Sequence, residues 1–274
     1  MNNPLSFSSL KLELFSKEGN RLKPASGFVV EAGNQYYLIT NQHVLSGRSI
    51  PVTEQEEPVL APYTLKTSIH IHWGEGEKGF PLSMGMRRRI TVPLYDDHNT
   101  PIWIEHPPKK QHQPIADIVA LPIQMNEKLR FNQTLSLFSG KFIGSLSNTN
   151  YWSKVSAIPI SVIDTEVEYG PSDAVHIIGY PLGWAPEGTD RSSSAFWRTS
   201  FIASEIYETG MTRSDTFFID PCAPDGMTGS PVVGMKNDCT KLLGVYSDRS
   251  TAEFGANAGL VWGAWQVKEL IGAS

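Results

Sequence analysis

Residues 225–233 read Asp-Gly-Met-Thr-Gly-Ser-Pro-Val-Val, in which the hydroxyl residue Thr228 stands close to two glycines and precedes a β-branched run. Glycines beside a hydroxyl favour a tight turn on which backbone N–H groups converge. The run that follows, residues 230–234, is typical of a buried strand. This stretch therefore predicts a hydroxyl held at a turn that leads directly into a strand.

Two earlier segments supply the side chains that such a hydroxyl needs for chemistry. Residues 38–44, Leu-Ile-Thr-Asn-Gln-His-Val, place His43 directly after an apolar strand pattern, and residues 116–121, Ala-Asp-Ile-Val-Ala-Leu, place Asp117 at the start of another. A hydroxyl becomes a useful nucleophile only when a base within hydrogen-bond reach takes its proton. Histidine titrates near neutral pH and suits that role, while a buried carboxylate fixes the tautomer of its ring.

The rest of the chain is typical of an all-β protein. Its 274 residues include 40% hydrophobic and 19% charged residues, with 23 Gly and 19 Pro, which excludes a disordered chain, a coiled coil and a collagen-like fibre. Residues 27–31 and 35–40 form a predicted hairpin around the turn Gly33-Asn34. Further short β-branched or aromatic runs predict strands at residues 68–73, 90–95, 118–123, 155–163, 174–180, 216–219, 230–234, 241–246 and 259–262. Many short strands without intervening helices favour antiparallel barrels or a sandwich.

The chain is expected to form two units. Residues 1–130 carry His43 and Asp117, and residues 131–274 carry Thr228. The second unit ends in the one predicted helix, residues 264–271, in which Val267, Leu270 and Ile271 share a face. The connection is expected at residues 126–150, and Pro-, Gly- and charge-rich insertions in the first unit are expected at residues 46–66, 74–85 and 96–114.

Charge and cysteine content narrow the class of protein. A net charge of −5 argues against a general nucleic-acid binder. No apolar run approaches the roughly 20 residues that a membrane span needs, and the first residues lack the features of a signal peptide. The two cysteines, Cys222 and Cys239, are too few for a disulfide framework. We expect two reduced thiols in a cytoplasmic protein, although the two could also pair.

Taken in order, these segments resemble the trypsin-like serine proteases of the chymotrypsin fold. The chain order His43, Asp117, hydroxyl is that of this family, and Thr-Asn-Gln-His-Val at residues 40–44 is similar to the bacterial intracellular or heat-shock type. Supporting matches lie at residues 175–181 and 243–247, and the resemblance covers residues 26–271. It implies two antiparallel six-stranded β-barrels followed by a short C-terminal helix, with the site in the cleft between the barrels.

The resemblance also implies a role for each residue of the site. His43, Asp117 and Thr228 would form the catalytic triad of an endopeptidase, and the N–H groups of Gly226 and Thr228 would form the oxyanion hole. Cys222 would lie near the base of the specificity pocket, where its lack of charge favours an uncharged substrate side chain. No cofactor or metal is required, and the partner is a protein or peptide substrate.

The second half of the chain would also supply the strand that pairs with the substrate backbone. By the resemblance, this strand contains Val245, Tyr246 and Ser247, and Ser247 would support Asp117 from the second barrel. In secreted relatives an aspartate precedes the nucleophile and pairs with the new N-terminus after cleavage of the precursor. Met227 cannot form that ion pair, so control is expected to come from loop ordering or from a partner protein instead.

One position departs from the family pattern Gly-x-Ser-Gly-Gly/Ser-Pro. Thr228 stands where the family has serine, and its extra methyl group restricts χ1 and crowds the path of attack. Three explanations are open: a natural threonine nucleophile, an engineered inactive variant, or a natural pseudoprotease. Ser230 is no substitute, because a shift of two residues takes it off the turn and onto the strand.

A second function remains open beside the enzyme. A catalytically inactive protease fold could capture an extended peptide by strand addition along residues 245–247. Other polar groups have plainer interpretations. The histidines at positions 70, 72, 98, 106 and 112 have no metal-ligand spacing, and the basic runs 87–89 and 109–110 are expected in solvated segments. Cys222 lacks the glycine-flanked turn of a nucleophile.

Overall fold

The computed structural model describes most of the predicted strands and all three candidate catalytic segments. The described residues are 4–47, 61–75, 84–107, 116–123, 151–163, 169–182, 195–206, 215–237, 239–249 and 258–272. The predicted connection at residues 126–150, most of the predicted insertions, and the basic pair 109–110 with His112 lie outside them. Among the described residues, no helix is long and apolar enough to cross a membrane.

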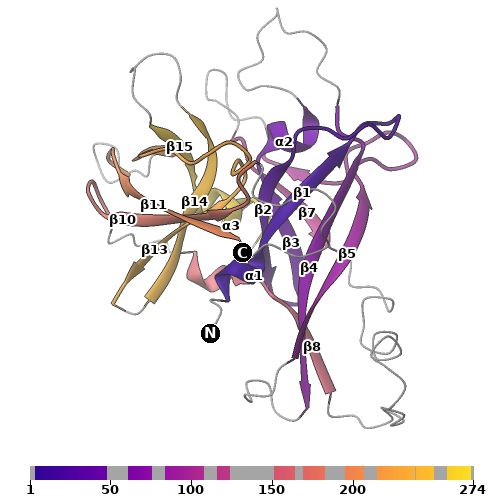
Figure 1. Ribbon diagram of the computed structural model, residues 1–274, viewed down its shortest axis with the longest axis horizontal. Coiled ribbons are helices and arrows are strands. Elements are labelled where there is room, and N and C mark those ends of the chain that lie inside the picture. The colour runs from indigo at the N-terminus through magenta and orange to yellow at the C-terminus, as the bar shows by residue number, and fades with distance from the viewer. Residues whose placement is uncertain are drawn as a thin grey trace, which may run out of the picture.

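The N-terminal unit is a sheet built around strands β1 to β7 (Figure 1). Its strands run in the order β5-β4-β1-β2-β3-β7-β6, with β8 paired to β4 and β9 paired to β2. The bounds are β1 Ser9–Phe15, β2 Ala25–Ala32, β3 Gln35–Thr40, β4 Thr64–Glu75, β5 Met84–Pro93, β6 Ile104–Glu105, β7 Val119–Ile123, β8 Tyr151–Val155 and β9 Ile158–Pro159. Two short helices belong to this unit, α1 Leu5–Ser8 and α2 Gln42–Ser46.

This sheet differs from the six-stranded barrel that was expected. It contains nine strands, and within the described residues they do not close into a barrel. The strand order ends at β5 and at the two-residue strand β6, and within the described residues no pairing joins these two strands. Strand β4 is long: its first residues pair with β1, and its last residues pair with β8. The far ends of β4, β5 and β8 therefore extend away from the rest of the sheet (Figure 1). The unit boundary at residue 130 stays a prediction, but β8 and β9 lie beyond it and pair with strands before it.

The C-terminal unit is a closed six-stranded barrel, as predicted. Its order is β10-β11-β12-β15-β14-β13, and the pairing of β13 with β10 closes it. The bounds are β10 Ala174–Gly179, β11 Phe196–Ile202, β12 Thr216–Asp220, β13 Pro231–Lys236, β14 Cys239–Arg249 and β15 Gly259–Gly263. A 3-10 turn, η3 Ile160–Val162, precedes the barrel, and the predicted terminal helix is α3 Trp265–Leu270.

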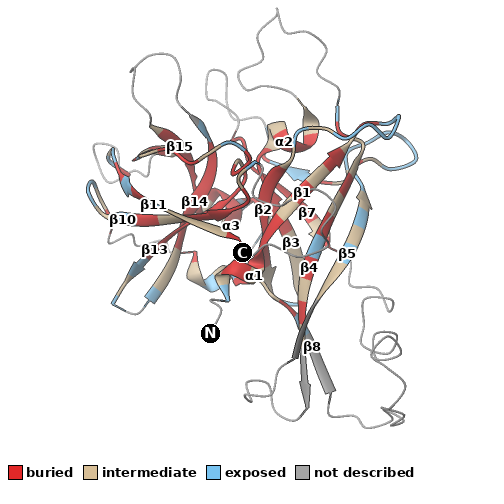
Figure 2. Cartoon of the chain, in the orientation of Figure 1, coloured by how far each residue is buried: buried red, intermediate tan, exposed pale blue. Residues whose placement is uncertain are grey.

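Three apolar cores stabilise this arrangement. One fills the first sheet, and one fills the second barrel around Ile177 and Phe217. The third lies between the units, where Phe28 and Ile39 of the first pack with Ile178 and Val245 of the second. The strands at this junction are almost wholly buried (Figure 2). Because apolar burial is the main favourable term in folding, this shared core fixes how the two units meet.

The shared core makes a testable contribution to stability. Phe28 is 0% exposed, so replacing it with alanine leaves a cavity at the junction and should lower the free energy of unfolding by about 3–5 kcal/mol. Urea denaturation followed by circular dichroism measures the loss. Phe201 is 50% exposed and is the matched control, since Phe201→Ala should change stability by about 0.5 kcal/mol or less. Equal losses in the two variants would show that the junction is not a packed core.

Candidate active site

The position of His43 is fixed by the turn between β3 and α2. Asn41 is fully buried at the start of α2, and its side-chain Nδ2 donates to the backbone oxygen of Asp117 at 2.7 Å. Gly47 ends the helix, and its amide donates to the oxygen of His43 at 2.9 Å. The apolar strand β3 thus leads into one short helical turn that carries His43 on the side of Asp117.

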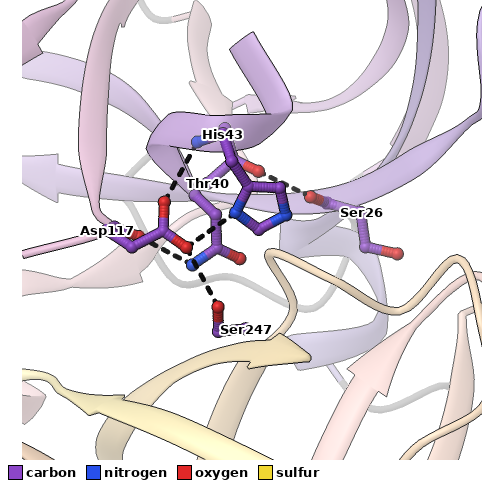
Figure 3. Close-up of polar contacts among 6 residues, drawn as sticks. Ser26, Thr40, His43, Asp117 and Ser247 are labelled. Carbon is purple, nitrogen blue, oxygen red and sulfur yellow. Dashed lines mark hydrogen bonds and ion pairs between the residues drawn. The ribbon is translucent and has the colours of Figure 1, made fainter. Parts of the chain in front are cut away.

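Asp117 is the centre of a hydrogen-bond network (Figure 3). Its carboxylate accepts from the backbone N–H of His43 at 3.0 Å, from His43 Nδ1 at 2.7 Å and from Ser247 Oγ at 2.9 Å. The residue itself is only 3% exposed. An ionised carboxylate can only accept, so the proton of a neutral His43 ring lies on Nδ1, and its Nε2 is left as an acceptor. The network orients the ring as a base.

The bond from Ser247 crosses between the two units. Ser247 lies on β14 of the barrel, whereas Asp117 directly precedes β7 of the first sheet. Both residues are nearly inaccessible to solvent, so their hydrogen bond forms in a low-dielectric environment where it is strong. A short segment of the first unit is therefore held in register with a strand of the second.

Two opposing effects set the pKa of His43. Burial lowers it, while the hydrogen bond and charge of Asp117, together with the charge of Asp248, raise it. The net result is a pKa above the ordinary value of 6.5. Since the folded pKa exceeds the unfolded one, this interaction stabilises the protein fully below pH 6.5, and the contribution is lost as the pH rises through the folded value.

The turn before β13 contains two backbone amides that donate no hydrogen bond within the part of the chain that the structure describes. The oxygen of Asp225 accepts from the amide of Leu182 at 2.8 Å, and the oxygen of Met227 accepts from the amide of Ser230 at 3.0 Å. In a trans peptide the N–H points opposite to the C=O, so the N–H groups of Gly226 and Thr228 face away from these partners. Neither amide donates a hydrogen bond to any described residue. Backbone amides without an internal acceptor are the groups from which anion-binding sites are built.

Glycine is required on both sides of this turn. Gly226 and Gly229 have φ values of +90° and +88°, a region that L side chains rarely adopt. A methyl group on Gly226 would lie 2.8 Å from the amide of Leu182 and 2.8 Å from the oxygen of Tyr180. A methyl group on Gly229 would collide with Ser26 and Thr40 of the first sheet. The turn is therefore packed tightly against both units.

Ser26 is a site residue that sequence reasoning missed. Its amide donates to the oxygen of Thr228 at 2.9 Å, and its hydroxyl donates to the oxygen of Gly226 and accepts from the amide of Tyr180, both at 2.9 Å. Thr40 Oγ1 donates to the oxygen of Ser26 at 2.9 Å. The signal in the sequence is a lone hydroxyl in the apolar strand β2, which has no face exposed to water. Through these hydrogen bonds, Ser26 holds the turn that contains Thr228 against the first sheet.

The structure places Thr228 on this turn, with its side chain half-buried. Thr228 and His43 are both described, and no hydrogen bond joins them. Catalytic hydrogen bonds are often long without substrate. Ser230 lies at the entry to β13, fully buried and packed against Gly179, which agrees with its structural interpretation.

The predicted substrate-pairing strand is only partly free. Val245 is paired with Pro231 on one side and Trp262 on the other, and its side chain lies in the core between the units. Tyr246 is occupied in the same way, since its amide donates to the oxygen of Ser230 and its own oxygen accepts from Gly229. The expected substrate contacts at these two residues therefore do not lie on a free edge. A peptide could add only from Ser247 onward.

The structure also describes the two cysteines and the histidine His70 that were considered in the sequence. Cys222 is buried and Cys239 exposed, and the two do not form a disulfide. His70 accepts a hydrogen bond from Arg87 Nε at 2.8 Å, and burial and the nearby charge of Arg87 lower its pKa to about 4. In the part of the chain that the structure describes, no three His, Cys, Asp or Glu side chains are grouped so that they could hold a metal ion.

Comparison with known proteins supports the fold. No protein-family model and no curated protein matches the chain. Among solved structures, the HtrA-type protease AlgW with a tripeptide matches with a TM-score of 0.52 and 12% identity, over 97% of this chain and 59% of that one. A substituted form of AlgW with a tripeptide gives 0.51 and 12%, over the same shares. The chain has the chymotrypsin-like protease fold.

The chain spans little more than half the length of the AlgW chains. A third similar structure is the Rv3671c protease from M. tuberculosis in its active form, with a TM-score of 0.48 and 15% identity over 98% of this chain and 83% of that one. At these levels of identity the likeness concerns the protease fold alone.

The raised pKa of His43 can be tested directly. Asp117→Asn removes the negative charge and the ionic hydrogen bond, so the pKa of His43 should fall below that of the parent protein. Titration of the ring C–H signals by NMR measures the midpoint, which in the parent should lie above 6.5. Asp173→Asn removes a carboxylate that pairs with Lys236 elsewhere and should leave the midpoint unchanged. Equal titration midpoints of His43 in the parent and in Asp117→Asn would contradict the conclusion that Asp117 raises the pKa of His43.

The role of Ser26 makes a second prediction. Ser26→Ala leaves the amide of Tyr180 and the oxygen of Gly226 buried without a partner, which should cost about 1–3 kcal/mol of stability. The amide of Tyr180 should also exchange its hydrogen faster, as measured by hydrogen–deuterium exchange. Ser68 is exposed on β4, so Ser68→Ala should change neither quantity. Unaltered hydrogen exchange at the amide of Tyr180 in Ser26→Ala would argue against the role of Ser26 in holding the turn.

Proposed function

We propose that the chain is an endopeptidase that cleaves peptide bonds through an acyl-enzyme on Thr228. The observation that carries this proposal is the combination of an oriented base and an unused pair of amides at one junction. Asp117 and Ser247 orient His43, while the N–H groups of Gly226 and Thr228 have no partner among the described residues. Acyl transfer needs these two parts together.

Each step follows from these groups. Thr228 Oγ1 attacks the carbonyl carbon of the substrate, and His43 Nε2 takes the hydroxyl proton. The negative charge that develops on the carbonyl oxygen is stabilised by the amides of Gly226 and Thr228. His43 then gives its proton to the leaving amine, which breaks the peptide bond and leaves an ester on Thr228. A water molecule, deprotonated by His43, attacks this ester; the ester bond breaks, His43 returns the proton to Thr228 Oγ1, and the carboxylic acid product leaves. Asp117 stays ionised and stabilises the charged ring throughout.

A threonine in place of serine changes the rate of the proposed reaction but not its sequence of steps. Its hydroxyl is as acidic as that of serine, but the methyl group limits χ1 to fewer positions. Holding χ1 off its preferred value by about 30° costs roughly 0.5–1.5 kcal/mol. We therefore propose an enzyme of reduced rate with Thr228 as its nucleophile. The absence of a hydrogen bond between Thr228 and His43 favours the alternative, an inactive peptide-binding module.

The cellular setting is also part of the proposal. Neither Cys222 nor Cys239 is part of a disulfide, and cysteines outside disulfides are typical of reducing compartments. We therefore propose that the protein works in the cytoplasm on protein or peptide substrates.

Four forms of the protein test the proposed chemistry: the parent, Thr228→Ser, Thr228→Ala and His43→Ala. The parent should hydrolyse an unfolded protein substrate and react with a fluorophosphonate probe, and Thr228→Ser should be about tenfold faster because the methyl group is gone. Thr228→Ala and His43→Ala should lose a factor of about 10⁶ in kcat. Release of peptides and mass-spectrometric mapping of the probe measure these results.

The same set separates the two candidate functions. If neither the parent nor Thr228→Ser releases peptides or reacts with the probe while both stay folded, the chain is not a protease, and the peptide-binding module gains support. If only Thr228→Ser reacts, the parent is an inactive form of an enzyme.

A further inference from the structure

A cavity of about 650 Å³ lies at one end of the first sheet. It is formed where β1 and β5 end and where β4 begins, and β4 pairs with both of the other strands (Figure 1). Its volume is in the range of ligand pockets. The side chains that decide its chemistry are those of Lys17, Tyr63, Tyr95, Asp96 and Asp97. None of these residues belongs to the candidate active site.

Two tyrosine rings form an aromatic wall of this cavity. Tyr63 and Tyr95 are stacked, with ring centroids 5.6 Å apart and an angle of 18° between the planes. The ring of Tyr95 packs in turn against Trp103, which is 6% exposed. The backbone of Tyr63 is fixed on both sides, since its amide donates to the oxygen of Phe15 at 2.8 Å and its oxygen accepts from Leu94 at 3.0 Å. The wall is therefore in place before any ligand binds.

The rim of the cavity carries charge on two turns. Lys17 lies in the turn after β1, and Asp96 and Asp97 lie in the turn after β5. Asp96 Oδ1 accepts hydrogen bonds from the amides of His98 and Thr100 at 2.9 and 2.8 Å, which holds the second turn in shape. Asp97 is exposed and forms no ion pair within the described part of the chain. Its carboxylate is available to a cation that enters the cavity.

The structure already places one cation on the aromatic wall. Lys17 Nζ lies over the ring of Tyr63, 5.7 Å from its centroid. Such contacts extend to about 6 Å, so this one is at the far end of the range. By comparison, Lys66 Nζ lies 4.3 Å from the centroid of Phe15. The face of Tyr63 thus attracts positive charge, and the exposed ammonium of Lys17 occupies it only weakly.

We propose that this cavity binds the arginine side chain of a peptide segment, with the guanidinium over Tyr63 in place of Lys17 and paired with Asp97. A guanidinium is planar and stacks on aromatic rings, and it is less strongly hydrated than an ammonium. Its N–H groups also match the geometry of a carboxylate. The rim is exposed, so the backbone of the peptide stays in water while one side chain enters.

The direction of the strands relates the cavity to the candidate active site. Strands β1 and β3 both pair antiparallel with β2, so they run in the same direction. Lys17 follows β1 and His43 follows β3. The cavity and the proposed base therefore lie at the same end of the first sheet. A peptide that binds in the cavity is held at that end, whether or not the chain is a protease.

Peptide binding without cleavage tests the proposal. The protein is the Thr228→Ala form, which lacks the proposed nucleophile, and the probe is acetyl-Gly-Gly-Arg-Gly-Gly-amide. Titration followed by NMR should shift the amide signals of Tyr63 and Tyr95 until they saturate at millimolar peptide. The same peptide with citrulline in place of arginine keeps the shape of the side chain without its charge. It should bind about tenfold more weakly, because both the ring contact and the ion pair are lost.

Four substitutions locate the binding to this cavity. Lys17→Gln removes the competing cation and should tighten binding about threefold, whereas Asp97→Asn should weaken it about threefold. Lys23→Gln is the matched control, since it removes a lysine that is 72% exposed from the same segment between β1 and β2, and it should leave the affinity unchanged. Tyr63→Leu should weaken binding about fivefold. Circular dichroism checks folding, and the exposed substitutions carry the test if Tyr63→Leu is not folded.

The outcomes separate this inference from the proposed function. Equal affinity for the arginine and citrulline peptides, or equal affinity of Lys17→Gln and Lys23→Gln, would overturn the inference. Tighter binding of free arginine than of the blocked peptide would overturn the choice of a peptide ligand. Cleavage by the parent without binding in the cavity would refute this inference alone. Binding in the cavity without cleavage by any form would leave it intact, while the protease function fails.

Discussion

The hydrogen bond from Ser247 Oγ to Asp117 is the contact on which the rest of the site depends. It joins two residues that lie 130 positions apart, one in the barrel and one just before strand β7 of the first sheet. His43 takes its orientation from Asp117, so the ring is placed correctly only while the two units keep their relation. The apolar core around Phe28 and Val245 maintains that relation, and the hydrogen bond sets its final register.

The opposite half of the site consists of backbone rather than side chains. Two carbonyls, of Asp225 and Met227, are held by the amides of Leu182 and Ser230, and the amides of Gly226 and Thr228 have no acceptor among the described residues. Ser26 holds the same turn from the other unit. Preorganised dipoles of this kind need no rearrangement when charge develops, which is why they contribute strongly to catalysis. The proposed base and the proposed anion site are thus connected by a few buried contacts across one junction.

Local sequence patterns are enough to predict much of the candidate site. His43 follows an apolar strand and Asp117 opens one, so their positions at strand ends could be inferred without a structure. Ser26 could not, because its partner Gly226 lies 200 residues away and no local pattern links them. Strand β1 was missed although its burial alternates strictly after Leu10. The first sheet is open because β5 and β6, the two ends of its strand order, do not pair within the described residues, and periodicity does not encode which strands pair.

The central claim is that the hydroxyl of Thr228 and the two amides act on one reacting group. A crystal structure of the protein after reaction with a peptidyl phosphonate tests this most directly. We expect a covalent bond between phosphorus and Thr228 Oγ1, with the phosphonyl oxygen about 2.7–3.1 Å from the amides of Gly226 and Thr228. A phosphonate bound to another residue, or a phosphonyl oxygen that faces away from both amides, would contradict the account.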